Sequence, residues 1–214
     1  MNKKLLLIGG GGHCKSVLDT LYRLGTFDEL GIIDIPSQVG KFVLETPIIG
    51  TDEDLPELFK KGFNSAFVTI GAIDSHDLKI RLVKRLSDLS FTFPNIIDPS
   101  VEISTYGEIG EGVFIGKSVI VNANYNIGSF AIINSGSICE HDTEIGDYTH
   151  VAPNTTILGG VKIGDRAHIG AASIVKQGTN IGTNTIIGMG SNVLSSIDSN
   201  VIAYGNPCKV VGQK

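Results

Sequence analysis

The sequence has no tryptophan, few other aromatic residues, and only three cysteines among its 214 residues. Cys14, Cys139 and Cys208 stand far apart in the chain, with no CxxC pair and no even-numbered set. This excludes a disulfide framework and favours a reducing, cytoplasmic setting.

Runs of basic or apolar residues are also scarce. The formal net charge is −5 and no basic run is present, so we expect no nucleic-acid partner. The apolar stretch in the opening MNKKLLLIGGGG is too short for a signal-peptide core or a membrane span. We therefore expect a soluble protein without a membrane partner.

What the sequence does contain is a repeat of six residues in its second half. Every sixth residue is Ile or Val with one exception, where Cys139 takes the place: Ile97, Ile103, Ile109, Ile115, Val121, Ile127, Ile133, Cys139, Ile145, Val151, Ile157, Ile163, Ile169, Val175, Ile181, Ile187 and Val193. This period fits neither a helix nor a hairpin and is typical of a hexapeptide parallel β-helix. Three units close one triangular coil, and the first residue of each unit points inward.

The first part of the chain is organised differently. Apolar strand-like runs at 5–8, 31–34 and 66–70 alternate with helical patterns. Gly25 is a stop signal for the first helix, Thr51 with Asp54 resembles a capping box, and Ser75 is placed to cap the last helix. This order predicts an α/β, Rossmann-like domain over residues 1–94, followed by the β-helix domain over residues 95–214.

A glycine-rich turn, Gly9 to Gly12, separates the first strand from the first helix, which begins near His13. Free backbone N–H groups at such a place suit the phosphates of a nucleotide. Three interpretations are open: a tight turn without a ligand, a dinucleotide site with Asp34 on the ribose of NAD, and a nucleotide-sugar site. The dinucleotide fingerprint is incomplete, because Cys14 occupies its third glycine position.

The histidines of the repeat have different places in their hexads. His141 is third, whereas His150 and His168 are both sixth and stand one coil of eighteen residues apart. The last two should stack, while His141 should lie on a different side of the prism from His150. Those two histidines converge on one ligand only if a neighbouring subunit lends one of them, which indicates a trimer.

Two chemistries compete for these histidines. Carbonic anhydrases built on this prism bind zinc with two histidines five residues apart plus a third, and this sequence has no such pair. General-base catalysis fits better, because Glu140 and Asp142 flank His141 and either carboxylate could orient the imidazole and raise its basicity. The alternative is a surface histidine in an acidic turn.

Several motifs occur in an order that resembles one bacterial family. They are the glycine turn with His13, the strand end at Asp34, Val68-Thr69-Ile70-Gly71, the hexads, Glu140-His141-Asp142, and Gly205-Asn206-Pro207-Cys208-Lys209. Together they resemble the sugar acetyltransferases that include sialic acid O-acetyltransferases and the UDP-4-amino-sugar N-acetyltransferases of bacillosamine synthesis. The resemblance implies a left-handed β-helix that forms a homotrimer and binds acetyl-CoA between subunits. It also implies an N-terminal domain for a nucleotide sugar, with UDP as the expected nucleotide.

The resemblance also implies roles for individual residues. His141 would take a proton from the amine or hydroxyl of the sugar, and Asp142 would tune it. Acetyl-CoA contacts are implied at His150, Ala171 and Met189. Nucleotide-sugar contacts are implied at Gly11, Gly12, His13, Asp34, Ile35 and Gly71, and no metal is implied.

The predicted function is direct acetyl transfer from acetyl-CoA to the amine of a nucleotide-linked 4-amino-4,6-dideoxy sugar. No acyl-enzyme is expected, because Cys139 falls at a core position. One alternative is O-acetylation of a sialic acid or a related sugar hydroxyl. Another is a non-catalytic nucleotide-sugar-binding trimer, and a dehydrogenase remains only if NAD binds the first domain.

Overall fold

The computed structural model describes residues 3–71 and 76–214. The chain divides into two compact units, Met1–Ile96 and Ile97–Lys214. The division falls between residues 96 and 97, close to the predicted boundary between 94 and 95. Ser75, the predicted helix cap, lies outside the described residues.

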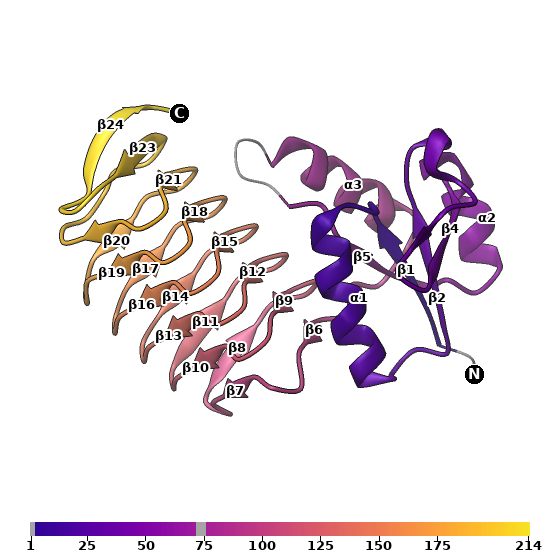
Figure 1. The fold of residues 1–214 in the computed structure, drawn as a ribbon, viewed down its shortest axis with the longest axis horizontal. Coiled ribbons are helices and arrows are strands. Elements are labelled where there is room, and N and C mark those ends of the chain that lie inside the picture. Colours follow the sequence, from indigo (N-terminus) through magenta and orange to yellow (C-terminus); the bar gives the residue numbers. More distant parts are fainter. Residues whose placement is uncertain (1–2, 72–75) are drawn as a thin grey trace. The chain divides into compact units, whose positions relative to one another are not determined.

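The N-terminal unit is built on a mixed sheet (Figure 1). The strands lie in the order β3-β4-β2-β1-β5, and β1 pairs in parallel with its neighbours β2 and β5. Leu5, Leu6 and Leu7 of β1 are completely buried, as expected for a strand covered on both faces. The strands are β1 (Lys4–Ile8), β2 (Glu29–Ile33), β3 (Phe42–Val43), β4 (Thr46–Gly50) and β5 (Ser65–Val68).

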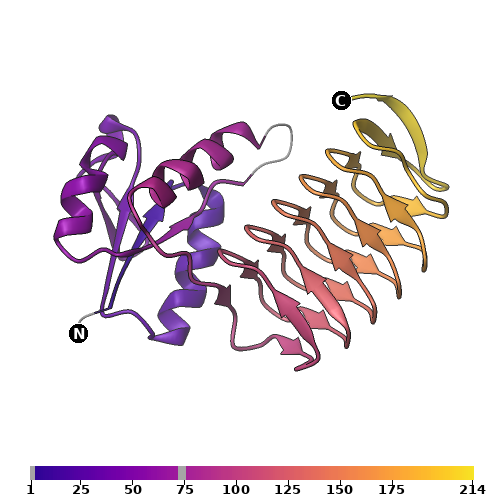
Figure 2. The same ribbon diagram turned by 180° about the vertical axis from the view of Figure 1, so that it is seen from behind.

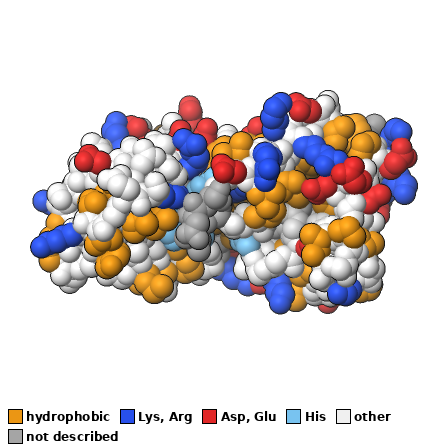
Figure 3. Space-filling model, turned by 90° about the horizontal axis from the view of Figure 1, so that it is seen from above, with side chains coloured by type: hydrophobic (Ala, Val, Ile, Leu, Met, Phe, Trp, Pro, Cys, Tyr) orange, Lys and Arg blue, Asp and Glu red, His pale blue; other side chains and the backbone are white. Residues whose placement is uncertain are grey.

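The helices of this unit are α1 (Gly12–Leu24), α2 (Leu55–Lys60) and α3 (Asp77–Asp88), with 3-10 turns η1 (Pro36–Gln38) and η2 (Asp52–Asp54). Helix α1 ends at Gly25, which has a φ of 58°, so the predicted stop is confirmed. The predicted capping box between Thr51 and Asp54 is also present, at the start of η2. On the face drawn in Figure 3, Lys and Arg side chains of this unit lie among Asp and Glu side chains.

The hairpin formed by β3 and β4 was not predicted. Strand β3 has only two residues and reaches β4 through Leu44, which has a φ of 51°. Strand β4 pairs in parallel with β2 and therefore extends the sheet beyond its predicted edge. The sequence TPIIG is short and begins with a threonine and a proline, so its periodicity gives no strand signal.

The C-terminal unit is a left-handed parallel β-helix, as predicted (Figure 2). Strands eighteen residues apart pair in parallel, as Ile138 of β13 does with Thr156 of β16. Three sheets form the sides of the prism, in the orders β22-β19-β16-β13-β10-β7, β20-β17-β14-β11-β8 and β24-β23-β21-β18-β15-β12-β9-β6. The strands are β6 (Ile96–Ile97), β7 (Glu102–Ile103), β8 (Gly107–Ile109), β9 (Phe114–Ile115), β10 (Ile120–Val121), β11 (Tyr125–Ile127), β12 (Ile132–Ile133), β13 (Ile138–Cys139), β14 (Glu144–Ile145), β15 (His150–Val151), β16 (Thr156–Ile157), β17 (Lys162–Ile163), β18 (His168–Ile169), β19 (Ile174–Val175), β20 (Asn180–Ile181), β21 (Ile186–Ile187), β22 (Asn192–Val193), β23 (Val201–Tyr204) and β24 (Lys209–Gln213).

The core of the prism consists of the first residues of the hexads. From Ile115 to Val193 all of them are buried, and Cys139 is completely buried among them. Ile97, Ile103 and Ile109, in the first coil, are only partly buried. Stacking of these apolar side chains along the prism is the main source of its stability.

The turns of the prism repeat as regularly as its strands. From Gly112 to Gly190 every sixth residue has a positive φ, whatever its side chain. Asn124 and Asp142 accept this conformation more readily than Phe130 or Arg166 do, because Asn and Asp visit the left-handed region more easily. Each turn therefore has one geometry, which fixes where the preceding residue, such as His141, lies at the corner.

The inward and outward positions of one strand should respond differently to truncation. In β20, Ile181 is 2% exposed and Asn180 is exposed. Ile181→Ala should destabilise the protein by about 2–5 kcal/mol, because it removes buried methyl groups and leaves a cavity. Thermal unfolding followed by circular dichroism should show a clear fall in midpoint for Ile181→Ala and almost none for the control Asn180→Ala. Equal midpoints would contradict the core assignment.

Candidate active site

His141 lies in the turn after β13 and contacts the next residue. Its Nδ1 atom is 2.6 Å from Oδ2 of Asp142, and the two side chains are 65% and 52% exposed. The other carboxylate oxygen, Oδ1, accepts a hydrogen bond of 2.5 Å from Nδ2 of Asn124. The sequence left open whether Glu140 or Asp142 orients the imidazole, and in the structure Asp142 holds it.

The charges of this turn favour a basic imidazole. The pKa of His141 is raised above 6.5, mainly by the hydrogen bond to Asp142 and further by the charges of Asp142 and Glu140. The pKa of Asp142 is lowered, first by the hydrogen bond from Asn124 and then by that from His141. Because Nδ1 faces the carboxylate, Nε2 is the nitrogen left to exchange a proton with a ligand.

Gly159, one coil after His141, makes room for the imidazole. A Cβ atom at this position would lie 2.7 Å from both Cε1 and Nε2 of His141. The backbone N–H of the next residue, Gly160, donates to the carbonyl oxygen of His141 at 2.9 Å. The ring therefore lies directly against the following coil, and this contact was not predicted from the sequence.

His150 and His168 lie next to each other in successive coils, as the eighteen-residue spacing predicts, and their rings meet edge to face. They are paired in β15 and β18, with ring centroids 4.9 Å apart and planes at 72°. Nε2 of His150 is also 3.5 Å from Nδ2 of Asn134. Strand β15 belongs to a different sheet from β13, which leads to His141, so the two histidines lie on different sides of the prism, as predicted.

Ala171 and Met189 occupy the same corner in successive coils, after β18 and β21. The backbone N–H of Gly190 donates to the carbonyl oxygen of Ala171 at 2.8 Å, and the Met189 side chain is 82% exposed. These two residues and the His150–His168 pair thus belong to neighbouring coils of the prism.

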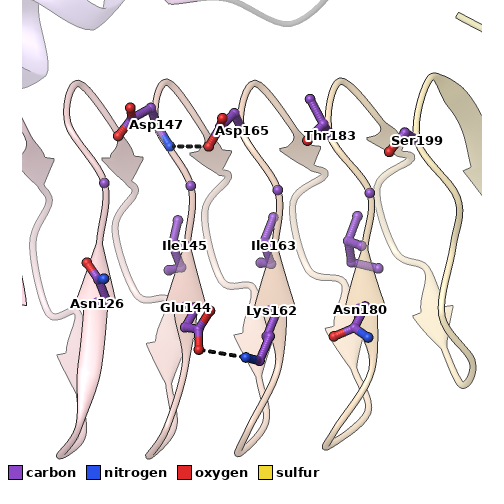
Figure 4. A pocket seen from close by; sticks show the side chains of 15 residues that line it. Asn126, Glu144, Ile145, Asp147, Lys162, Ile163, Asp165, Asn180, Thr183 and Ser199 are labelled. Carbon is purple, nitrogen blue, oxygen red and sulfur yellow. Dashed lines mark hydrogen bonds and ion pairs between the residues drawn. The ribbon is translucent and has the colours of Figure 1, made fainter.

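Open grooves run along the side of the prism that contains β11, β14, β17 and β20. Figure 4 shows one of about 590 Å³, with polar side chains along its length. Lys162 pairs with Glu144 at 2.8 Å, and the backbone N–H of Asp147 donates to Asp165 at 3.0 Å. A second groove, of about 720 Å³, is bordered by Asn124 and Asp142 and so reaches the His141 turn.

In the N-terminal unit, Asp34 holds the glycine turn in place. Its Oδ2 accepts from the backbone N–H of Gly10 and its Oδ1 from that of Ile35, both at 2.6 Å. Gly11 is the N-cap of α1 and caps it with no side-chain hydrogen bond. A Cβ atom on Gly11 or Gly12 would meet nothing within 4 Å, so the start of the helix is open to a ligand.

Two pockets meet at Asp34 and Ile35. One, of about 510 Å³, is also bordered by Gly11, Lys15 and Lys41. The other, of about 360 Å³, is largely apolar and is lined by Ile8, Gly9, Ile33, Asp34, Ile35, Pro36, Thr51, Asp52, Glu53, Ile70, Leu78 and Leu82. Of the predicted nucleotide-sugar contacts, Asp34 and Ile35 line both pockets and Gly11 lines the first. Gly12, His13 and Gly71 are not among the lining residues of either pocket.

His13 is partly buried and has an unexpected neighbour. Burial, and to a smaller extent the charge of Lys79, lowers the pKa of His13 to about 4. Lys79, on α3, is 4% exposed, and its burial lowers its own pKa to about 7. His13 is therefore neutral at pH 7. The burial of Lys79 was not predicted, because a lysine on a helix is usually exposed.

The cysteines are buried free thiols. Burial raises the pKa of Cys139 to about 12 and that of Cys14 to about 11, so neither is a thiolate at neutral pH. Among the residues that the structure describes, no group of three or more His, Cys, Asp or Glu side chains is arranged to hold a metal ion. Within the same residues, no helix has both the length and the apolar character needed to cross a membrane.

Two family models match the chain. The PglD N-terminal domain matches residues 4–86, and the bacterial transferase hexapeptide model (six repeats) matches residues 142–177. The comparison with curated proteins gave no match.

Solved structures match the whole chain. The H141N variant of perosamine N-acetyltransferase from Caulobacter crescentus, in complex with CoA and GDP-perosamine, is 35% identical with a TM-score of 0.93 and covers 100% of this chain and 99% of its own. The acetyltransferase domain of PglB from Neisseria gonorrhoeae FA1090, in complex with acetyl coenzyme A, is 27% identical with a TM-score of 0.91. The match covers 99% of this chain and 100% of the PglB domain. WeeI from Acinetobacter baumannii AYE is 26% identical with a TM-score of 0.85, and the match covers 98% of this chain and 100% of WeeI.

The matches extend over both units, and the identity with the first of these structures is high enough to assign the family. The fold, the order of the two units and the hexapeptide repeat agree with that assignment. The chain belongs to the hexapeptide-repeat sugar acetyltransferases that carry a PglD N-terminal domain, and it is an acetyltransferase that uses acetyl-CoA.

Proposed function

We propose that the protein transfers the acetyl group of acetyl-CoA to the amine of a nucleotide-linked 4-amino-4,6-dideoxy sugar, with His141 as the general base. The observation that carries the proposal is the His141–Asp142 pair, in which the carboxylate holds Nδ1 and leaves Nε2 for the substrate. An amine is a strong nucleophile once it is neutral. Removal of its proton and correct orientation therefore suffice for the reaction.

The reaction is a direct transfer. The amine nitrogen attacks the thioester carbonyl while Nε2 of His141 takes the amine's proton. A C–N bond forms, the C–S bond breaks, and the proton passes from the imidazolium to the departing sulfur of CoA. Cys139 takes no part, because its thiol is completely buried and protonated.

The N-terminal unit offers a binding place for the nucleotide. The start of α1 is open, and Lys15 and Lys41 border the adjoining pocket, so an anionic diphosphate would meet backbone N–H groups and positive charge. The sequence led us to expect UDP. We propose GDP instead, because the 35% identical relative was solved with GDP-perosamine.

We also propose that the active unit is a homotrimer in the cytoplasm. His141 and His150 lie on different sides of one prism, so a site that uses His141 as base and His150 against acetyl-CoA takes one from each of two subunits. Ala171 and Met189 would then contact the CoA arm through their backbones. Three free cysteines suit a reducing compartment, where acetyl-CoA and nucleotide sugars are also available.

Thiol release from acetyl-CoA, measured against a panel of acceptors, tests the function. The panel holds GDP-, UDP- and dTDP-linked 4-amino-4,6-dideoxy sugars, with free and CMP-linked sialic acid. We expect turnover with a GDP-linked amino sugar, and a loss of roughly 100-fold or more in kcat for His141→Ala with acetyl-CoA affinity unchanged. Turnover of His141→Ala close to that of the parent would refute the base assignment, and release only with sialic acid would make the protein an O-acetyltransferase.

The pH dependence of kcat/KM should reveal the effect of the Asp142 carboxylate on the pKa of His141. His141 acts as a base only when neutral, so activity is lost as the pH falls through its pKa, which Asp142 raises above 6.5. Asp142→Asn should lower that pKa and move the acidic limb of the profile to lower pH. The substrate amine titrates identically in both enzymes, so the displacement between the two profiles isolates the enzyme group. Superimposable limbs would show that Asp142 does not act on the titrating base.

Asp34 should matter for the sugar nucleotide and not for acetyl-CoA. Asp34→Ala removes the acceptor of two backbone hydrogen bonds that shape the turn, and we expect KM for the nucleotide sugar to rise about tenfold or more. The dissociation constant of acetyl-CoA, measured by isothermal titration, should not change. Asp88→Ala, at an exposed ion pair with Lys84, is the matched control and should leave both values unchanged.

A further inference from the structure

Three side chains form a continuous hydrogen-bonded chain at the corner that carries His141. Asn124 lies eighteen residues, one coil, before Asp142. Its Nδ2 donates to Oδ1 of Asp142 at 2.5 Å, while Oδ2 of the same carboxylate lies 2.6 Å from Nδ1 of His141. Each oxygen of Asp142 therefore has its own partner.

The backbone keeps this arrangement in register. Asn124 and Asp142 both have a left-handed conformation, with φ of 63° and 61°. The backbone N–H of Asp142 donates to the carbonyl oxygen of Ala123 at 3.1 Å, and that of Asn124 donates to the carbonyl oxygen of Tyr106 at 2.5 Å. The amide of Asn124 is thus presented to Asp142 by two coils that are bonded to each other.

An exposed acid–base pair needs such support. The side chains of His141 and Asp142 are 65% and 52% exposed, and an ion pair at that exposure contributes little and holds its geometry poorly. A donor on the second oxygen restrains rotation of the carboxylate and stabilises its ionised form, which agrees with the lowered pKa of Asp142.

Asn124 also borders the groove that reaches the Asp142 carboxylate. It lines the groove of about 720 Å³ together with Asp142, Tyr106, Gly160 and Lys162. A change at Asn124 therefore acts directly on the Asp142 carboxylate and not through a distant part of the fold.

We propose that Asn124 is a positioning residue, whose amide fixes the Asp142 carboxylate so that it in turn fixes the tautomer and orientation of His141. This proposal rests on the proposed role of His141 as the base. Asn124 acts through Asp142 and makes no contact with the reacting atoms in this account.

Asn124→Gly is the sharpest test, since glycine adopts a positive φ without strain and only the amide is lost. We expect kcat to fall about tenfold or more, with little change in KM for acetyl-CoA. The acidic limb of the kcat/KM profile should move to lower pH, as for Asp142→Asn. Asn124→Asp keeps the shape but puts an acceptor where the donor stood, so it should not rescue activity.

Asn184→Gly is the matched control. Asn184 has a φ of 58°, and its Nδ2 bonds Asn200 in the adjacent turn at 2.8 Å, so it shares the backbone geometry and the inter-coil bond but lies on another corner. We expect its kcat and pH profile to equal those of the parent. Equal losses of kcat and of thermal stability in both glycine variants would reduce Asn124 to a structural role and overturn the proposal.

His141→Ala separates this proposal from the proposed function. If His141→Ala is inactive while Asn124→Gly has the parent's kcat and pH profile, the positioning role is wrong and the base assignment stands. If His141→Ala keeps the parent's turnover, the base assignment itself is wrong. Full activity in Asn124→Asp would show that shape, and not the donated hydrogen bond, is what matters.

Discussion

Parallel backbone pairing between coils, eighteen residues apart, determines where every side chain of the C-terminal unit lies. The inward β-branched residues fill the prism, and one residue of positive φ per hexad turns the chain at each corner. A residue therefore meets its equivalent in the next coil. This is why His150 meets His168 edge to face, why Asn124 reaches Asp142, and why Gly159 lies against His141.

On the proposed function, the two units supply different parts of the chemistry. The N-terminal unit has an open helix start beside Asp34, whose two oxygens hold the turn and Ile35 in place. The β-helix has the exposed imidazole with its carboxylate partner, and it keeps the Cys139 thiol inside the core. In the proposed function, the N-terminal unit recognises the anionic nucleotide and the β-helix carries out the proton transfer.

Features that depend on local sequence were predictable, and features that depend on packing were not. The hexad period predicted a short strand with one inward residue in each unit, and Gly25 and the Thr51–Asp54 box predicted helix ends, because backbone geometry there is decided within a few residues. The β3–β4 hairpin was missed because two residues give no period. Burial of Lys79 arises from tertiary packing, and the hydrogen bond that Asn124 donates to Asp142 comes from the preceding coil, so neither follows from local sequence. The eighteen-residue spacing would have revealed Asn124 and Gly159, since it relates each to the His141 turn.

On the proposed function, Nε2 of His141 takes the proton from a sugar amine. A crystal structure with CoA and a GDP-linked 4-amino-4,6-dideoxy sugar tests this most directly. We expect the amine nitrogen at about 3 Å from Nε2 of His141, with the Asp142 carboxylate still hydrogen-bonded to Nδ1. A sugar whose amine lies beyond hydrogen-bond reach of His141, with another side chain at the amine, would contradict it.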